Sequence, residues 1–101
     1  MKVIFSAKAD QDLASLFGYI NNNLHNSIAA HTIADKILRL SQKLSAFPEM
    51  GTSLRTVDSK LGSYRYLLAD NYLLVYKVAG EEVFIVRILY AKSDYVQLLR
   101  G

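Results

Sequence analysis

The chain has 101 residues, a formal net charge of +3, and a composition that is 51% hydrophobic and 21% charged. It has no cysteine and no uninterrupted apolar run long enough to span a membrane, and its first residues, MKVIFSAKAD, do not read as a signal peptide. We therefore expect a single domain over residues 1–101, without disulfides or membrane spans, in the cytoplasm.

The charge is unevenly distributed along the chain. Residues 36–65 hold six basic side chains against two acidic ones, whereas the first 35 residues hold two basic and three acidic ones. An acidic partner or a phosphate backbone would be attracted to the middle of the chain. A solvated helix face followed by a loop explains the same pattern more simply.

The first half of the chain has the periodicity of a strand followed by two helices. Residues 2–5 read as a short strand, and Ser6 is a plausible N-cap for a helix over about residues 7–22. Asparagines in residues 21–26 favour a helix end, and a second helix is expected from residue 26 or 27 to Ala46. Two helices joined by a short polar loop make an αα-hairpin. The apolar positions at helical spacing are Leu13, Leu16, Phe17, Ile20 and Leu24, then Ile33, Ile37, Leu40, Leu44 and Phe47.

The second half has the pattern of a sheet. After Pro48 and Gly51 end the second helix, residues 51–62 read as a loop. Residues 63–69, 71–78 and 83–90 then read as three antiparallel strands, and Ser93 is expected to cap a short C-terminal helical turn. The predicted fold is α+β: an N-terminal strand, an αα-hairpin, and a three-stranded meander in one sheet with the helices on one face.

The last strand is apolar on both of its faces. With a side-chain period of two, Phe84, Val86, Ile88 and Tyr90 point one way, and Val83, Ile85, Arg87 and Leu89 point the other way. Because the two helices can cover only one face, the second face needs another cover. That cover is either the C-terminus of the chain or another protein.

Arg87 is out of keeping with its apolar neighbours. It either binds a phosphate or an acidic partner, or it pairs with a carboxylate such as Asp94 or extends to the rim of the sheet. Arg65, between Tyr64 and Tyr66, makes a similar but weaker case. Tyrosines near basic residues suit RNA, although ordinary strand packing explains most of them.

His25 and His31 are the only histidines, and no carboxylate stands at ligand spacing from them. We expect no metal site. The sequence also has no glycine-rich phosphate loop and no pattern of a Ser/His/Asp triad, so we expect no cofactor.

The ordered set of segments resembles, over nearly the whole chain, the RelE/ParE superfamily of toxins from type II toxin–antitoxin systems. The matching segments are residues 2–13, Leu44–Gly51 (LSAFPEMG), Tyr64-Arg65, Asn71–Val78 (NYLLVYKV) and Val86–Tyr95 (VRILYAKSDY).

The resemblance implies one of two activities. The gyrase-poisoning ParE-like branch is favoured, because Arg87–Ala91 (RILYA) followed by Ser93-Asp94 is similar to its Arg-hydrophobic-Leu-His-Gly segment and Arg-Asp pair. The alternative is a RelE-like, metal-independent ribonuclease that cleaves mRNA on the ribosome, although Leu73 and Ser93 stand where that branch is often basic. A non-toxic or degenerate binding module is a further alternative.

We assign candidate residues to these activities. The catalytic candidates, for a ribonuclease only, are Arg65, Arg87 and Tyr95. The implied partners are a cognate antitoxin with an amphipathic, acidic segment, and gyrase or the ribosome with its mRNA as the target. The expected partner-binding residues are Val83, Ile85, Arg87, Leu89, Tyr90 and Lys92.

Overall fold

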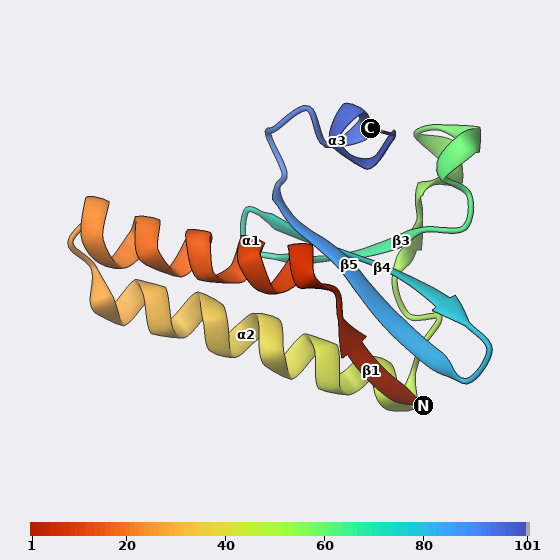
Figure 1. Cartoon of the computed structure of the whole chain (residues 1–101), viewed down its shortest axis with the longest axis horizontal. Helices are drawn as coiled ribbons and strands as arrows, with labels where there is room; N and C mark the ends of the chain where they lie inside the picture. Colours follow the sequence, from red (N-terminus) through yellow and green to blue (C-terminus); the bar gives the residue numbers. More distant parts are fainter. Residues whose placement is uncertain (101) are drawn as a thin grey trace.

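The computed structural model describes residues 1–100 and shows a five-stranded sheet with two long helices on one face (Figure 1). The strand order is β1-β5-β4-β3-β2; β1 is parallel to β5, and the other neighbours are antiparallel. The predicted α+β fold is confirmed. The elements are β1 (Lys2–Phe5), α1 (Ala7–Gly18), α2 (Ser27–Ala46), β2 (Thr52–Ser53), β3 (Arg65–Ala69), β4 (Tyr72–Ala79), β5 (Glu82–Tyr90) and α3 (Tyr95–Arg100).

The helical hairpin forms as predicted, with one difference at its tip. The first helix was expected to run to residue 22, but α1 ends at Gly18 and continues as a π-helical turn over Tyr19–Asn23. His25 then adopts a left-handed φ of 50°, and the side chain of Asn26 caps α2 by accepting a hydrogen bond from the Ala29 N–H at 3.0 Å. The asparagine-rich connector therefore ends one helix and begins the next.

The helices bury one face of the sheet. Ile37 and Leu44 of α2 are fully buried beneath this face, against sheet residues such as Tyr76 and Ile85. The main core is made by the buried residues Ala9, Leu16, Ile20, Ala30, Ile33, Ile37, Leu44, Ala69, Leu74, Tyr76, Val83, Ile85 and Ile88.

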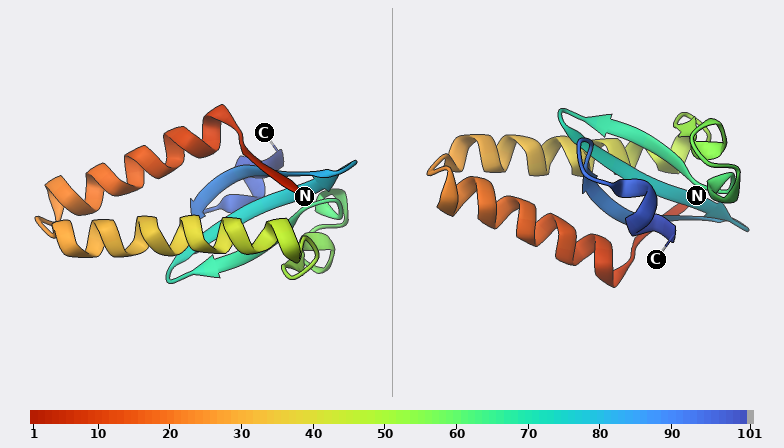
Figure 2. Two further views of the ribbon diagram at one scale, coloured as in Figure 1. Left: turned by 90° about the horizontal axis from the view of Figure 1, so that it is seen from below. Right: turned by 90° about the horizontal axis from the view of Figure 1, so that it is seen from above.

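The opposite face of the sheet is covered by the chain itself. Leu54 and Leu61, from two 3₁₀ turns between β2 and β3, pack on Leu73 and Val75 of β4, and α3 adds apolar side chains to the same cluster. Figure 2 shows α3 on the side of the sheet away from α2. The sequence left open whether the C-terminus or another protein covers this face. In the structure the C-terminal helix α3 covers it, together with residues 54–61.

A β-bulge in β5 changes which side chains share a face. Val75 pairs with Arg87 but the next residue, Tyr76, pairs with Ile85, so Val86 is the extra residue. Val83 and Ile85 therefore face the helices and are fully buried, and Ile88, which is 5% exposed, belongs to the same core. The expectation that Val83 and Ile85 share an open face with Arg87 is wrong, because one extra residue inverts the alternation beyond it.

The C-terminal helical turn is confirmed, but its predicted cap is not. The hydroxyl of Ser93 donates to the carbonyl of Tyr90 at 2.6 Å, and it is the carbonyl of Asp94 that accepts the first helical hydrogen bond, from Leu98. Ser93 therefore stabilises the turn that leaves β5, and α3 begins after Asp94.

Gly51 lies where the chain passes from α2 to β2, in close contact with the sheet. Its N–H donates to the hydroxyl of the fully buried Tyr76 at 2.9 Å. A Cβ at this position would lie 2.6 Å from that hydroxyl and 2.8 Å from the carbonyl oxygen of Tyr66. Only glycine fits without displacing the strand.

We predict that Gly51→Ala lowers the free energy of unfolding by about 1–3 kcal/mol, because the added methyl group is overpacked against a backbone oxygen and a buried ring. Urea denaturation measures this change. Gly18→Ala is the matched control, since its Cβ would meet only Asn22, at 3.9 Å. It should be neutral or stabilising, as alanine is the better helix former. Equal effects of the two substitutions would contradict this account.

Candidate partner-binding site

A carboxylate on α1 holds the bulged strand. The side chain of Asp12 accepts hydrogen bonds from the Arg87 guanidinium at 2.8 and 3.1 Å, and also from the backbone N–H of Ile88 at 2.9 Å. The two side chains are only 16% and 20% exposed. Bidentate pairing of this kind fixes direction as well as distance. Asp12 therefore fixes α1 against β5 immediately after the bulge.

Ser6 binds two backbone carbonyls at the bulge. Its N–H donates to the carbonyl of Ile85, and its hydroxyl donates to the carbonyl of Val86, both at 2.9 Å. The same hydroxyl accepts from the Ala9 N–H at 3.0 Å, which makes Ser6 the N-cap of α1, as predicted. The start of α1 and the bulge are thus built from one hydrogen-bonded cluster.

Arg87 is accordingly a structural residue as well as a surface cation. The hydrogen bonds that the Arg87 guanidinium donates to Asp12 raise its pKa, against the opposing effect of burial, so the guanidinium stays charged. The sequence offered Asp94 as a pairing partner; the structure uses Asp12 instead. Loss of activity in an Arg87 variant would therefore report on folding as well as on binding.

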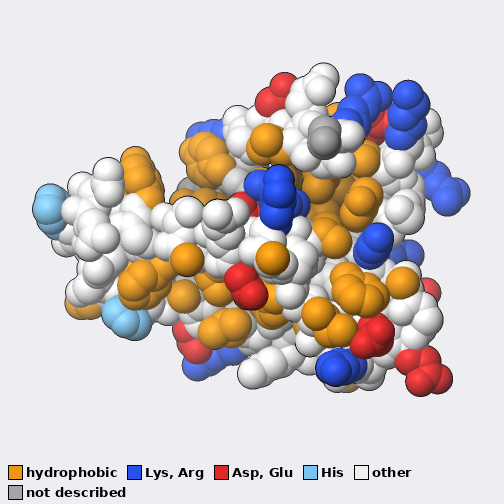
Figure 3. Space-filling view, viewed as in Figure 1, with side chains coloured by type: hydrophobic (Ala, Val, Ile, Leu, Met, Phe, Trp, Pro, Cys, Tyr) orange, Lys and Arg blue, Asp and Glu red, His pale blue; other side chains and the backbone are white. Residues whose placement is uncertain are grey.

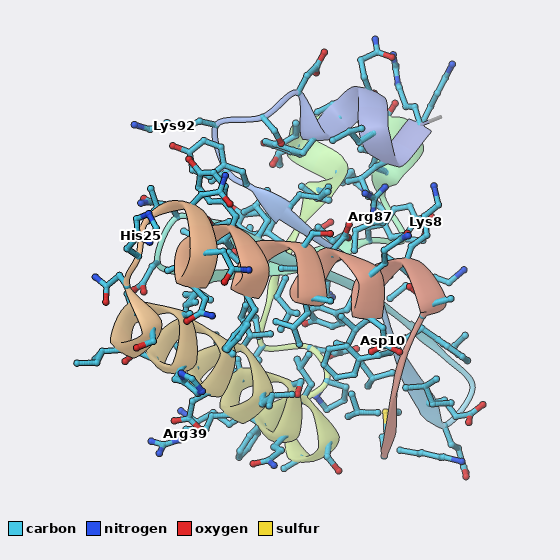
Figure 4. All side chains as sticks on the ribbon, turned by 60° about the vertical axis from the view of Figure 1, so that its left-hand side comes forward. Lys8, Asp10, His25, Arg39, Arg87 and Lys92 are labelled. Atoms are coloured by element: carbon cyan, nitrogen blue, oxygen red, sulfur yellow. The ribbon has the colours of Figure 1, made fainter. Side chains whose placement is uncertain are left out.

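Next to this cluster lies a groove of about 370 Å³ between the start of α1, β5 and α3. Apolar side chains such as Val86 and Leu99 line it, and Lys8 and Arg87 lie at its edge. Figure 4 shows Lys8 and Arg87 close together at the start of α1, and Figure 3 shows Lys and Arg side chains around apolar ones in this region. The lining residues are Ser6, Ala7, Lys8, Tyr64, Val86, Arg87, Leu98 and Leu99.

The far wall of the groove is α3. Its Val96 and Leu99 pack on the cluster that covers the second face of the sheet, which we call the second-face cluster (Leu54, Leu61, Leu73 and Val75). Arg100 of α3 pairs with Asp58 at 2.7 Å. The Asp58 side chain also accepts from the Lys60 N–H at 2.9 Å, which orients it. The groove is therefore a place where an apolar group and a carboxylate of a partner could be bound together.

The structure separates the catalytic candidates. Arg65 stands opposite Tyr76 in the sheet ladder and donates to the carbonyl of Gly51 at 2.8 Å, on the side of the helices. Arg87 points to α1 and the groove, and Tyr95 opens α3 and packs on the second-face cluster. Within the described residues 1–100, no hydrogen bond or ion pair joins any two of these three side chains. A catalytic role for them stays a prediction.

The expected partner-binding residues divide into two groups. Val83, Ile85 and Leu89 are at most 5% exposed, so they are packing residues. Arg87 borders the groove, whereas Tyr90 lies near the hairpin tip with Tyr72, at a ring-centroid distance of 5.8 Å. Lys92 extends from the loop after β5, on the same side of Figure 4 as His25.

Several groove residues were missed from sequence. Lys8, Leu98 and Leu99 were not among the candidate residues chosen from the sequence. The usable signal was Ser6, because a predicted N-cap places the next residues at the start of a helix. The N-cap signal could not show that α3 folds back toward the start of α1.

The described residues 1–100 contain no group of three or more His, Cys, Asp or Glu side chains placed to hold a metal ion. In the same residues, no helix combines the length and the apolar character needed to cross a membrane.

Comparison with known proteins identifies the family. The fold is that of small toxins, and residues 3–95 match the family model described as ParE toxin of type II toxin-antitoxin system, parDE. The chain therefore belongs to the ParE toxin family, within the RelE/ParE superfamily that the sequence resembles. No curated protein matches the chain significantly.

Three solved structures share the fold. A chain of the chromosomal ParDE TA system from P. aeruginosa is 20% identical, with a TM-score of 0.75 and coverage of 91% of this chain and 97% of that one. The YoeB/ParE toxin from Agrobacterium tumefaciens is 14% identical, with a TM-score of 0.64 and coverage of 89% and 98%. A YafQ mutant from E. coli is 12% identical, with a TM-score of 0.51 and coverage of 99% and 98%.

We predict that Asp12→Ala costs about 2–3 kcal/mol of unfolding free energy, since it leaves the Arg87 guanidinium and the Ile88 N–H without their partner. Asp12→Asn should cost less, because an amide oxygen can still accept from Ile88. Asp10→Ala, in the first turn of α1 and exposed, is the control and should cost at most about 1 kcal/mol. Chemical denaturation compares the three; equal losses for Asp10 and Asp12 would contradict the assigned role.

Proposed function

We propose that this chain is the toxin of a type II toxin–antitoxin module, that it arrests growth by binding DNA gyrase, and that a cognate antitoxin neutralises it. One observation carries the preference for binding over RNA cleavage. Arg65 is held by the Gly51 carbonyl on one face of the sheet, and Arg87 is held by Asp12 beside the other. Cations engaged in this way are poorly placed to act together on one phosphate.

The family supports the toxin role, and the segment Arg87–Ala91 supports the ParE-like branch. A ribonuclease would need a general base and a general acid arranged about a 2′-hydroxyl. Arg65, Arg87 and Tyr95 come from separate parts of the fold, so they do not favour that arrangement. Because gyrase and the antitoxin are intracellular proteins, the proposal places this chain in the cytoplasm.

The chemistry of the groove supports the antitoxin. It offers apolar side chains to the nonpolar face of an amphipathic segment and two cations, Lys8 and Arg87, to its carboxylates. Since Arg87 is already paired with Asp12, Lys8 is the cation more available to a partner. We propose that an acidic segment of the antitoxin occupies this groove.

The target is tested in two assays. Induction without the antitoxin should arrest growth with filamentation and DNA damage, and the purified protein should inhibit supercoiling by gyrase while leaving mRNA intact in a translation reaction. The antitoxin encoded next to the toxin should reverse both effects. Rapid mRNA cleavage with normal gyrase activity would show a ribonuclease instead, and unaffected growth would show a non-toxic module.

The groove is tested with a charge reversal. We predict that Lys8→Glu weakens binding of the acidic antitoxin segment by about 3–10-fold and reduces the dependence of affinity on salt, because an attractive charge at the rim becomes repulsive. Calorimetric titration with a synthetic segment measures both. Lys43→Glu, an exposed lysine on α2, is the control and should bind as the parent does. Equal weakening by the two variants would indicate only long-range attraction.

A further inference from the structure

The tip of the helical hairpin differs in chemistry from the rest of the molecule. Residues 13–34 contain no Asp, Glu, Lys or Arg, although 21% of the chain is charged. Figure 3 shows this end of the molecule, at the left, without red or blue side chains. Interface cores are depleted in charge in the same way, because burying an unpaired charge is costly.

A pocket of about 580 Å³ opens at this end. Leu16, Tyr19 and Leu24 from the hairpin line it together with Ser15, and Tyr72 and Tyr90 close it from the sheet. Tyr19, Leu24 and Tyr90 are 52%, 55% and 44% exposed, which is high for large apolar side chains. We call this site the tyrosine pocket.

No Asp, Glu, Lys or Arg side chain lines the tyrosine pocket. Burial raises the pKa of Tyr72, and the neighbouring Tyr90 and Tyr19 raise it further, so the hydroxyl is protonated at neutral pH. The nearby Asp70 is paired with Lys36 at 2.8 Å. Lys92, beyond Tyr90, extends away from the sheet in Figure 4.

The polar side chains here both donate and accept hydrogen bonds. Tyrosine and serine hydroxyls and the amides of Asn21, Asn22 and Asn23 all do so, whereas Lys and Arg only donate and carboxylates only accept. A surface of this kind can pair with an identical surface. Two copies of a chain with net charge +3 also repel least where neither copy carries charge.

From these observations we infer that the tyrosine pocket is the contact surface of a homodimer, in which each copy packs its hairpin tip against the same tip of a second copy. The contact is isologous, so the rim residue Leu24 of each copy lies at the interface. This surface is separate from the basic groove proposed for the antitoxin. Dimerisation therefore leaves the groove free.

The dimer is tested by sedimentation velocity over a wide concentration range at constant pH and salt. The wild-type chain should show a concentration-dependent monomer–dimer equilibrium. Leu24→Lys should raise the dimer dissociation constant at least about tenfold, because an unpaired charge is buried at the contact. Leu38→Lys changes an exposed leucine of α2 that does not line the pocket, and it should leave the constant unchanged.

A second variant gives an independent readout. Because the chain has no cysteine, Leu24→Cys introduces a single thiol that should form an intermolecular disulfide much faster than Leu38→Cys does. Circular dichroism checks that each variant is folded. A wild-type chain that stays monomeric would overturn the inference, as would a dimer that survives Leu24→Lys or that both lysine variants weaken equally. So would a monomeric chain in which Leu24→Lys weakens only the binding of gyrase or antitoxin.

Discussion

The contact on which the rest of the structure depends is the Asp12 carboxylate on α1, which binds both the Arg87 side chain and the Ile88 N–H. A β-bulge leaves backbone groups without ladder partners, and buried groups of this kind are costly unless they are satisfied. Asp12 of α1 and Ser6, the N-cap of α1, bind the Ile88 N–H and the carbonyls of Ile85 and Val86 there. The same contacts fix the angle at which α1 leaves the sheet, and so the position of the groove beside it.

The bulge also decides which residues are core and which are surface. Before the bulge, Val83 and Ile85 point to the helices. After it, Ile88 does, so the positions that face the helices change from odd to even residue numbers. Without the extra residue Val86, Arg87 would point into the helix-side core. The bulge instead lets β5 bury its aliphatic side chains while Arg87 reaches α1 and borders the groove.

Two surfaces of contrasting chemistry follow from this arrangement. The groove at the start of α1 is apolar with a basic rim, which suits an acidic amphipathic segment. The tyrosine pocket at the hairpin tip is neutral, with groups that both donate and accept, which suits a copy of itself. They lie at opposite ends of α1, because the groove includes Ser6 before the helix and the pocket includes Tyr19 after it, so a partner bound at one would leave the other open.

The sequence by itself determined the helical hairpin, the positions of β1 and the three long strands, and the C-terminal turn. These depend on local spacing and on residues such as Asn26 and Pro48, whose effects act over a few positions. Only the tertiary structure decided the parallel pairing of β1 with β5, the bulge, and the Asp12–Arg87 pair, whose members are 75 residues apart. A side-chain period of two cannot reveal an inserted residue, and a carboxylate on a helix does not indicate which distant cation it will meet. Some residues of the groove, such as Arg87, were predicted from the sequence. That they line one groove was not predicted, because this depends on how the helices and the C-terminal turn pack on the sheet.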